Sequence, residues 1–246
     1  MDTYILEGWV SVRAALVSGN RDVAEILIDK DKRPSRQIDA LVKRAKEKRV
    51  ALRRVARANI DALSEGKTHG GVIAQVSARK FKTLDELGKG SSAGFLALLD
   101  GVEDPYNFGQ ALRALHAAGA HGVLLLERNW TTAAATVARA SAGASEFIPM
   151  ATLPAGNEVE AVSTFKTRGF RVIATGMNGS SLFETDFSGP TLLLIGGERR
   201  GVRKSLAGLA DATVTIPYGR DFKQALDTTS AAAVLAFEVM RQRTST

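Results

Sequence analysis

The second half of the chain alternates short, continuous apolar runs with segments whose apolar residues recur at helical spacing. Runs such as 95–99 and 192–195 contain no polar residue, which is typical of strands in a parallel sheet covered on both faces. This alternation predicts an α/β fold. Strands are expected at 95–99, 122–126, 147–150, 171–175, 192–195 and 213–216, and helices at 108–118, 132–141, 157–167, 203–208 and 228–242.

The first third of the chain predicts a smaller α/β unit with one strongly basic helix. Strands are expected at 4–6, 23–28, 50–55 and 71–76, and helices at 10–16, 34–48 and 60–63. In the basic helix the cationic side chains lie mostly opposite an apolar stripe, so that one face is buried and the other faces water. The stripe consists of Ile38, Leu41, Val42 and Ala45.

A segment rich in Gly and Ser separates the two patterns. It includes Gly88, Gly90 and Gly94, and its composition is typical of a flexible linker. We therefore predict a first domain over 1–76, a linker over 77–94 and a second domain over 95–246.

The basic excess is confined to the first part of the chain. The net charge is +7, and residues 1–90 carry 19 Lys and Arg against 12 Asp and Glu, whereas residues 91–246 carry 14 of each. This asymmetry favours a nucleic-acid-binding module attached to a neutral one, with a well-solvated helical surface as the alternative. The candidates for phosphate contact are Arg36, Lys43, Arg44, Lys46, Arg53 and Arg54.

Composition limits the other functional classes. The chain has no cysteine, which removes disulfide and thiolate chemistry, and its three histidines form no metal-ligand pattern, so we expect no metal. No apolar run approaches the roughly 18 residues of a membrane span, and the first residues lack the features of a signal peptide. We therefore expect a cytoplasmic protein with no membrane partner.

Three stretches of the second half combine a strand, a glycine-bearing turn and the start of a helix. They read LALLDGVEDPYNFGQALR (96–113), LLLIGGERRG (192–201) and IPYGRDFKQALDTTSAAA (216–233). In α/β proteins such junctions present backbone amides and a few side chains at a ligand crevice. No P-loop is present and GGERRG is not the dinucleotide fingerprint, which disfavours an unrelated nucleotide-binding enzyme.

Taken in order, these stretches resemble the three motifs of the SpoU family of RNA ribose 2′-O-methyltransferases, part of the SPOUT superfamily. The segment that contains HGGVIAQV (69–76) resembles the substrate-binding extension of family members that modify ribosomal or transfer RNA. The matching positions are Asn107, Gly109 and Arg113 in the first motif, Gly196 and Glu198 in the second, and Ile216, Pro217 and Leu226 in the third.

The resemblance implies both a fold and an activity. The implied fold is a C-terminal parallel-sheet domain with a trefoil knot, preceded by a small α/β domain of the ribosomal-protein-like, RNA-binding type. The implied activity is methyl transfer from S-adenosylmethionine to a ribose 2′-hydroxyl of RNA. Ribosomal RNA is the first choice of substrate and tRNA the second. The implied assembly is a homodimer.

The resemblance also assigns roles to residues. It places Arg113 in catalysis, together with Asn107 and Glu198. An arginine side chain resists deprotonation, so we expect Arg113 to hold the target phosphate and stabilise the developing 2′-alkoxide. The implied cofactor-binding residues are Thr175, Gly176, Gly196, Ile216, Leu226 and Asp227.

The chain departs from the family pattern in the second and third motifs. The usual Ser-Leu-Asn core of the third motif reads Ala225-Leu226-Asp227, followed by Thr229 where serine is usual, and Arg199 stands where glycine is common. Two hypotheses therefore stay open. One is an active methyltransferase, and the other is an RNA-binding family member with weak or lost catalysis.

Overall fold

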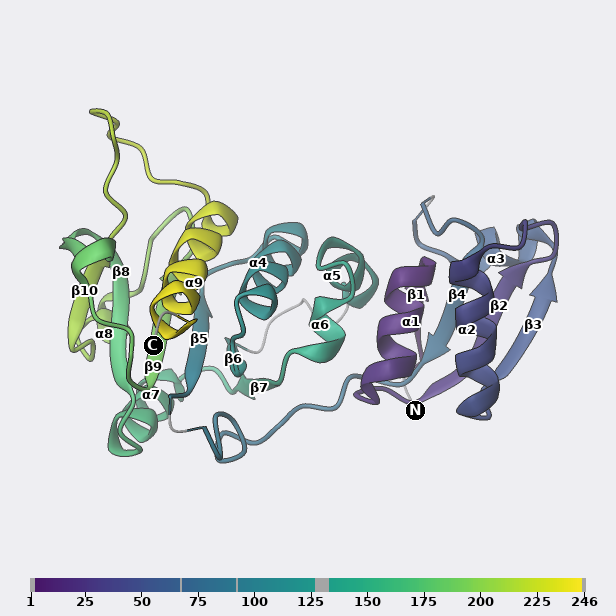
Figure 1. Cartoon of the computed structure of the whole chain (residues 1–246), viewed down its shortest axis with the longest axis horizontal. Helices are drawn as coiled ribbons and strands as arrows, with labels where there is room; N and C mark the ends of the chain where they lie inside the picture. Colours follow the sequence, from purple (N-terminus) through teal and green to yellow (C-terminus); the bar gives the residue numbers. More distant parts are fainter. Residues whose placement is uncertain (1–2, 67, 92, 127–132, 245–246) are drawn as a thin grey trace. The chain divides into compact units, whose positions relative to one another are not determined.

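The computed structural model describes residues 3–66, 68–91, 93–126 and 133–244 (Figure 1). Contacts within the chain divide it into two compact units. Unit 1 comprises Met1–Lys80 and Trp130–Phe147, and unit 2 comprises Phe81–Asn129 and Ile148–Thr246. The division of the sequence at 76 and 94 stays a prediction. The contacts add that a segment from the second half of the chain packs with the first unit.

Unit 1 is built on a mixed four-stranded sheet in which β2 and β3 are parallel and the other pairs antiparallel. Helices α1 and α2 pack on one face of this sheet, and α3 packs on the other. In spatial order the strands are β1 (Tyr4–Glu7), β4 (Val72–Val76), β2 (Val23–Asp29) and β3 (Ala51–Val55). The helices are α1 (Trp9–Ser18), α2 (Arg36–Glu47), α3 (Arg57–Leu63), α5 (Ala134–Ala140) and α6 (Ala144–Phe147).

The basic helix α2 forms as its apolar stripe predicts. Ser35 caps it, since its hydroxyl accepts a hydrogen bond from the Ile38 backbone N–H at 3.4 Å. Ile38, Leu41 and Ala45 are buried against the sheet, whereas Val42 is 38 % exposed at the edge of the stripe. Burying this one face leaves the cationic face in solvent.

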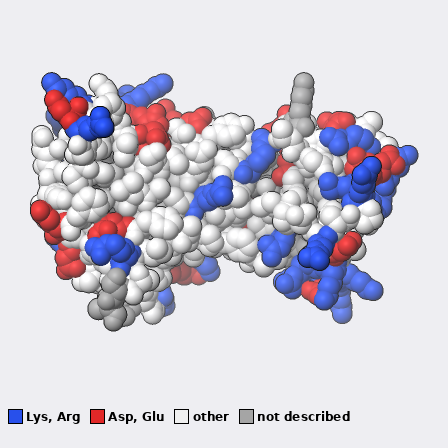
Figure 2. All heavy atoms as spheres, turned by 45° about the horizontal axis from the view of Figure 1, so that its top comes forward, with Lys and Arg blue, Asp and Glu red and all other residues white. Residues whose placement is uncertain are grey.

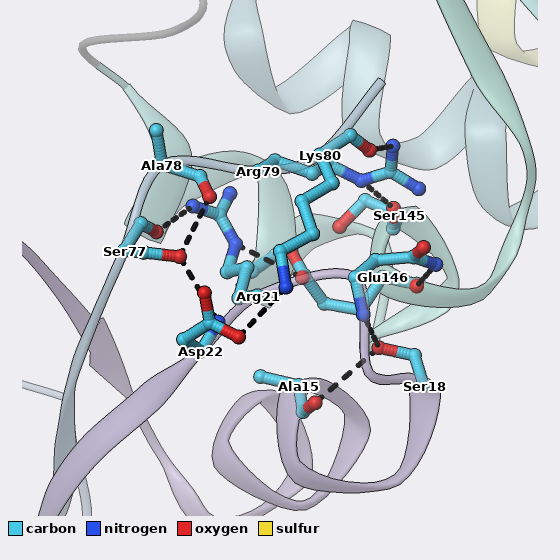
Figure 3. Close-up of polar contacts among 12 residues, drawn as sticks. Ala15, Ser18, Arg21, Asp22, Ser77, Ala78, Arg79, Lys80, Ser145 and Glu146 are labelled. Atoms are coloured by element: carbon cyan, nitrogen blue, oxygen red, sulfur yellow. Dashed lines mark hydrogen bonds and ion pairs between the residues drawn. The ribbon is translucent and has the colours of Figure 1, made fainter. Parts of the chain in front are cut away.

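A buried polar network joins α6 to the rest of unit 1 (Figure 3). Arg21 donates from Nε to Oε2 of Glu146 at 2.9 Å, and both side chains are buried. Arg79 donates from Nε to the carbonyl oxygen of Ser145 at 2.9 Å, and burial lowers the pKa of Arg79 to about 10. The first residues of the predicted linker are therefore fixed to unit 1.

Unit 2 is built on a six-stranded sheet in which every pair of neighbours is parallel, as the apolar runs predict. Helices α7 and α8 pack on one face, and α4 and α9 pack against each other on the opposite face (Figure 1). In spatial order the strands are β10 (Ala212–Thr215), β8 (Arg171–Ser181), β9 (Thr191–Gly196), β5 (Phe95–Asp100), β6 (Gly122–Leu126) and β7 (Met150–Leu153). The helices are α4 (Pro105–Ala117), α7 (Glu158–Thr167), the 3₁₀ turn η2 (Leu182–Glu184), α8 (Lys204–Ala207) and α9 (Thr228–Thr244).

The strand predicted at 147–150 is wrong. Phe147 is the last residue of α6, and β7 begins only at Met150, which pairs with Val123 of β6. The helical turn ends before Pro149 because the residue before a proline disfavours the α conformation. The apolar run Phe-Ile-Pro-Met therefore straddles the end of a helix and the start of a strand.

The core of unit 2 also includes part of the predicted linker. Leu87 is buried with Leu96 and Leu124 of the sheet, in the cluster that α7 completes through Phe165. No helix in the described ranges is long and apolar enough to cross a membrane. The trefoil knot stays a prediction.

Candidate active site

A pocket of about 740 Å³ lies in unit 2 at the carboxyl ends of strands β8, β9 and β10. Ligands of open α/β sheets bind at this edge, where the strands end and loops begin. Glu198, predicted to act in catalysis, lines the pocket. So do the predicted cofactor-binding residues Thr175, Gly176, Gly196, Ile216 and Leu226.

The glycines of the second motif allow backbone segments of the same chain to come into close contact. A Cβ on Gly196 would lie 2.2 Å from the carbonyl carbon of Gly201, and one on Gly197 would lie 2.3 Å from the carbonyl oxygen of Gly101. The Gly197 N–H donates to the Asp100 carbonyl at 2.7 Å. Only glycine lets the loop fold back over the strand end in this way. The shape of the pocket wall depends on it.

Side chains hold the backbone that faces the pocket. The Thr175 hydroxyl accepts a hydrogen bond from the Gly196 N–H at 3.3 Å, and the Thr228 hydroxyl donates to the Gly196 carbonyl at 3.4 Å. The Leu226 N–H donates to the Tyr218 hydroxyl at 3.0 Å. These contacts fix the strand end and the third-motif loop at the pocket.

Asp227 does not line the pocket among the residues that the structure describes. Its carboxylate instead caps α9, accepting hydrogen bonds from the Ser230 backbone N–H at 2.9 Å and the Ser230 hydroxyl at 2.6 Å. These two bonds lower the pKa of Asp227. Asp and Asn cap helices equally well, which gives the departure from asparagine a structural explanation.

The structure brings together Asn107 and Glu198, two of the residues predicted to act in catalysis. The Asn107 amide donates from Nδ2 to Oε1 of Glu198 at 3.0 Å. Asn107 lies in the first turn of α4, which begins at Pro105 rather than at the predicted 108 because the Asp104 carboxylate accepts the Asn107 N–H at 2.8 Å. The helix start therefore aims the amide at the second-motif loop.

Arg113 does not share this placement. It is exposed on α4, and no described residue gives it a hydrogen bond, an ion pair or a place in the pocket wall. It follows Asn107 by six positions, which turns it about 120° away around the helix. Within one chain, Arg113 is presented to solvent rather than to the pocket.

An ion-pair cluster behind the second-motif loop, in which a half-buried arginine meets two carboxylates, was not predicted. Arg203 donates from Nε to Oδ1 of Asp100 at 2.9 Å and from Nη1 to Oε1 of Glu158 at 3.0 Å, and both carboxylates are buried. The hydrogen bond to Asp100 raises the pKa of Arg203. An acidic residue ending an apolar strand is the sequence signal that could have identified it. The cluster fixes the far end of the loop that begins at Gly196.

The predicted phosphate-binding residues are all exposed on unit 1, where Lys and Arg side chains gather (Figure 2). Arg44 pairs with Glu47 at 3.0 Å on α2. Because successive residues of a strand point to opposite faces, Arg53 and Arg54 of β3 do not share a face. Three of the predicted phosphate-binding residues have no hydrogen bond or ion pair among the described residues: Arg36, Lys43 and Lys46. In the same described residues, no cluster of His, Asp or Glu could hold a metal ion.

Comparison with known families places the chain in one of them. The family model described as "SpoU rRNA Methylase family" matches residues 94–237. A second model, described as "RNA 2'-O ribose methyltransferase substrate binding", matches residues 5–82. The chain therefore belongs to the SpoU family, a family of RNA-methylating enzymes.

Individual relatives cover almost the whole chain. A Shewanella oneidensis protein named 23S rRNA (guanosine-2′-O-)-methyltransferase RlmB is 29 % identical over 98 % of this chain and 98 % of its own length. YacO of Bacillus subtilis, assigned to the TrmH family of tRNA/rRNA methyltransferases, is 32 % identical over 84 % of each chain. The crystal structure of the SpoU methyltransferase AviRb from Streptomyces viridochromogenes, in complex with AdoMet, has a TM-score of 0.79 at 26 % identity, covering 99 % of this chain and 91 % of AviRb.

Proposed function

We propose that this protein transfers the methyl group of S-adenosylmethionine to a ribose 2′-hydroxyl of ribosomal RNA in the cytoplasm, with tRNA as the second choice of substrate. The observation that carries the proposal is the pocket of about 740 Å³ beside the hydrogen-bonded pair Asn107 and Glu198. The relative RlmB is named for this chemistry on 23S rRNA. AviRb binds AdoMet in a fold that superposes on nearly the whole chain.

The pocket fits S-adenosylmethionine in size and chemistry. Its volume of about 740 Å³ lies within the roughly 300–1,000 Å³ typical of small-ligand sites. Ile216 and Leu226 would face the adenosine part, and the Glu198 carboxylate would favour a cationic sulfonium. When bound, the cofactor supplies an electrophilic methyl group. The residues of the chain have only to bind, orient and stabilise.

Arg113 and Asn107 would act on the RNA side of the reaction. The Asn107 amide holds the Glu198 carboxylate in place at the pocket wall. The exposed Arg113 guanidinium can donate two parallel hydrogen bonds to a phosphate and stabilise negative charge that develops on the 2′-oxygen. A guanidinium has five N–H donors and no acceptor, so it would serve as an electrostatic group and not as the base.

Unit 1 would bind the RNA, and a second copy of the chain would complete the assembly. The exposed cations of α2 match a polyanion. The helices α4 and α9, which pack together, leave Tyr106, Val234 and Phe237 partly exposed at 50 %, 37 % and 43 %. This apolar surface supports a homodimer, which light scattering in solution will measure.

Two measurements test the proposed function. Calorimetry with S-adenosylmethionine is expected to show binding at one site per chain. Mapping of ribose methylation in RNA from cells with and without the gene is expected to show one lost modification, and its position identifies the substrate. A protein that binds RNA but not S-adenosylmethionine would be the RNA-binding family member instead.

Replacing Arg113 tests its place in the reaction. Arg113→Ala is expected to abolish methyl transfer while calorimetric affinity for S-adenosylmethionine is retained, because the side chain lies outside the pocket. Arg113→Lys keeps the charge but loses the two-pronged geometry, so we expect partial activity. Near-normal turnover of the alanine variant would remove Arg113 from the mechanism.

A further inference from the structure

An exposed aromatic ring stands at the mouth of the pocket. Phe222 lines the pocket and yet is 55 % exposed. Its ring centroid lies 5.9 Å from that of Tyr218, with the two planes inclined at 54°. Both rings belong to the loop between β10 and α9. A large ring left half in water costs hydrophobic free energy unless a ligand covers it.

The loop that carries Phe222 is anchored at both ends. The Tyr218 hydroxyl accepts the Leu226 N–H at 3.0 Å, which closes the loop across eight residues. The Asp227 cap then fixes the start of α9. The ring is therefore presented by a tied loop and not by a free chain, so less ordering entropy is lost when a ligand covers it.

Charge around the ring suits a nucleic acid. In the sequence, Arg220 and Lys223 stand on either side of Phe222. Both are exposed, and the described residues give neither cation a hydrogen bond or an ion pair. Asp221, also exposed, offsets one of the two charges. An aromatic ring between cations is the arrangement that binds single-stranded RNA, in which bases stack on rings and phosphates meet Arg or Lys.

We propose that Phe222 is the platform on which the base of the target nucleotide stacks when its ribose enters the pocket. This inference rests on the proposed function. A ribose 2′-oxygen must come within about 3–3.5 Å of the methyl group, so the attached base has to leave its neighbours and lie at the pocket mouth. A stacking surface there replaces the contacts that the base gives up. Since every base has a π-face, such a platform holds the nucleotide without reading its sequence.

The experiment separates RNA binding from cofactor binding. The variants are Phe222→Ala, Phe222→Tyr, which keeps a ring, and Phe183→Ala, which removes a ring that is 62 % exposed and absent from the described pocket wall. For each, calorimetry gives the Kd for S-adenosylmethionine without RNA. Filter binding gives the Kd for total RNA from cells that lack the gene, and ultraviolet cross-linking maps the peptides joined to nucleotides.

Phe222→Ala is expected to weaken RNA binding about tenfold and to change the Kd for S-adenosylmethionine by less than threefold. Phe222→Tyr restores RNA binding, Phe183→Ala changes neither value, and the wild-type cross-link falls on Phe222. A tenfold loss of cofactor affinity in Phe222→Ala would show that the ring covers the cofactor and overturn the proposal. Unchanged RNA binding would also overturn it. If the wild type itself fails to bind S-adenosylmethionine, the proposed function fails, a result that the variants cannot mimic.

Discussion

Asp227 is the residue at which the chain departs most clearly from the family, and its carboxylate caps α9. The two hydrogen bonds from Ser230 favour the charged form and lower the pKa of Asp227 in the folded protein. A carboxyl group with a lowered folded pKa stabilises the fold above its unfolded pKa of about 4, and this contribution is lost as the pH falls through the folded pKa. The cap therefore has a pH signature of its own.

We predict that Asp227→Ala lowers the free energy of unfolding by about 1 kcal/mol at pH 7, the usual value of a lost N-cap. Asp227→Asn, which keeps a capping oxygen, is expected to stay within a few tenths of a kcal/mol of the wild type. Urea unfolding between pH 2 and pH 7 measures both. The alanine penalty should shrink below about pH 4, where the Asp227 carboxyl of the unfolded chain takes up a proton before that of the folded protein.

The sequence-based prediction for Asp227 was a role in cofactor binding, and the same variants test it. A large fall in S-adenosylmethionine affinity in Asp227→Asn, with stability unchanged, would restore that role. Unchanged affinity would leave only the cap.

Individual contacts differ in how far the sequence anticipates them. The motifs named Asn107 and Glu198 as candidates for catalysis, and the structure adds the hydrogen bond between them. The Arg203 cluster was not anticipated, since no pattern of spacing tells that Arg203 meets Asp100 and Glu158 across the fold. The roles of Tyr218 and Phe222 also depend on how a loop folds back, which periodicity does not encode.

At the scale of elements, the end of β9 is where strand, loop and pocket meet. Gly196→Ala places a Cβ 2.2 Å from backbone atoms of Gly201, which no side-chain rotation can relieve. We predict a loss of about 1–3 kcal/mol in stability, as for overpacked sites, and at least a tenfold loss of S-adenosylmethionine affinity because the pocket wall has to shift. Urea unfolding and calorimetry measure the two effects.

Gly189→Ala is the matched control for this element. It lies in the turn before β9, and a Cβ there meets no atom within 4 Å. We expect it to leave affinity and stability unchanged. Equal effects of the two substitutions would show that the close approach at Gly196 is not needed for the pocket.

The strands of unit 2 could be predicted where they are apolar, and the prediction failed where they are not. Strand β5 is a fully buried run and β9 is buried up to Ile195, whereas β8 continues to Ser181 through residues 176–181, where Met177 is the one large apolar side chain. This extension pairs with the edge strand β10 after a shift in register, as in the pairing of Val214 with Ser180. The end of β8 lies beside the edge strand and contains no apolar run. The sequence pattern therefore predicted that this strand ends at 175.

At the scale of the whole molecule, charge and chemistry lie on different units. The exposed cations of α2 belong to unit 1, and the pocket belongs to unit 2. The charge asymmetry of the sequence anticipated this division. The packing of the segment that ends at Phe147 with unit 1 was not anticipated, because Arg21 meets Glu146 across 125 positions and Arg79 meets Ser145 across 66.

The separation of charge from chemistry predicts that RNA affinity and cofactor affinity can be changed independently. The triple variant Arg36→Gln, Lys43→Gln and Lys46→Gln removes three exposed cations from α2 without touching its buried face. If each cation displaces a counterion from the RNA, the slope of log Kd against log salt should fall by about 0.7–0.9 for each residue removed. Filter binding between 50 and 300 mM salt measures that slope, and calorimetry should show an unchanged affinity for S-adenosylmethionine.

The exposed Lys89 of unit 2 supplies the control for this salt experiment. Lys89→Gln removes one positive charge outside unit 1, so the change in net charge alone predicts one third of the triple variant's effect. Contact with phosphate through α2 predicts instead that Lys89→Gln leaves the slope unchanged. A slope that falls in proportion to net charge in all variants would assign RNA binding to the general field of the protein. A slope that responds only to α2 would make this helix the surface on which the RNA backbone lies.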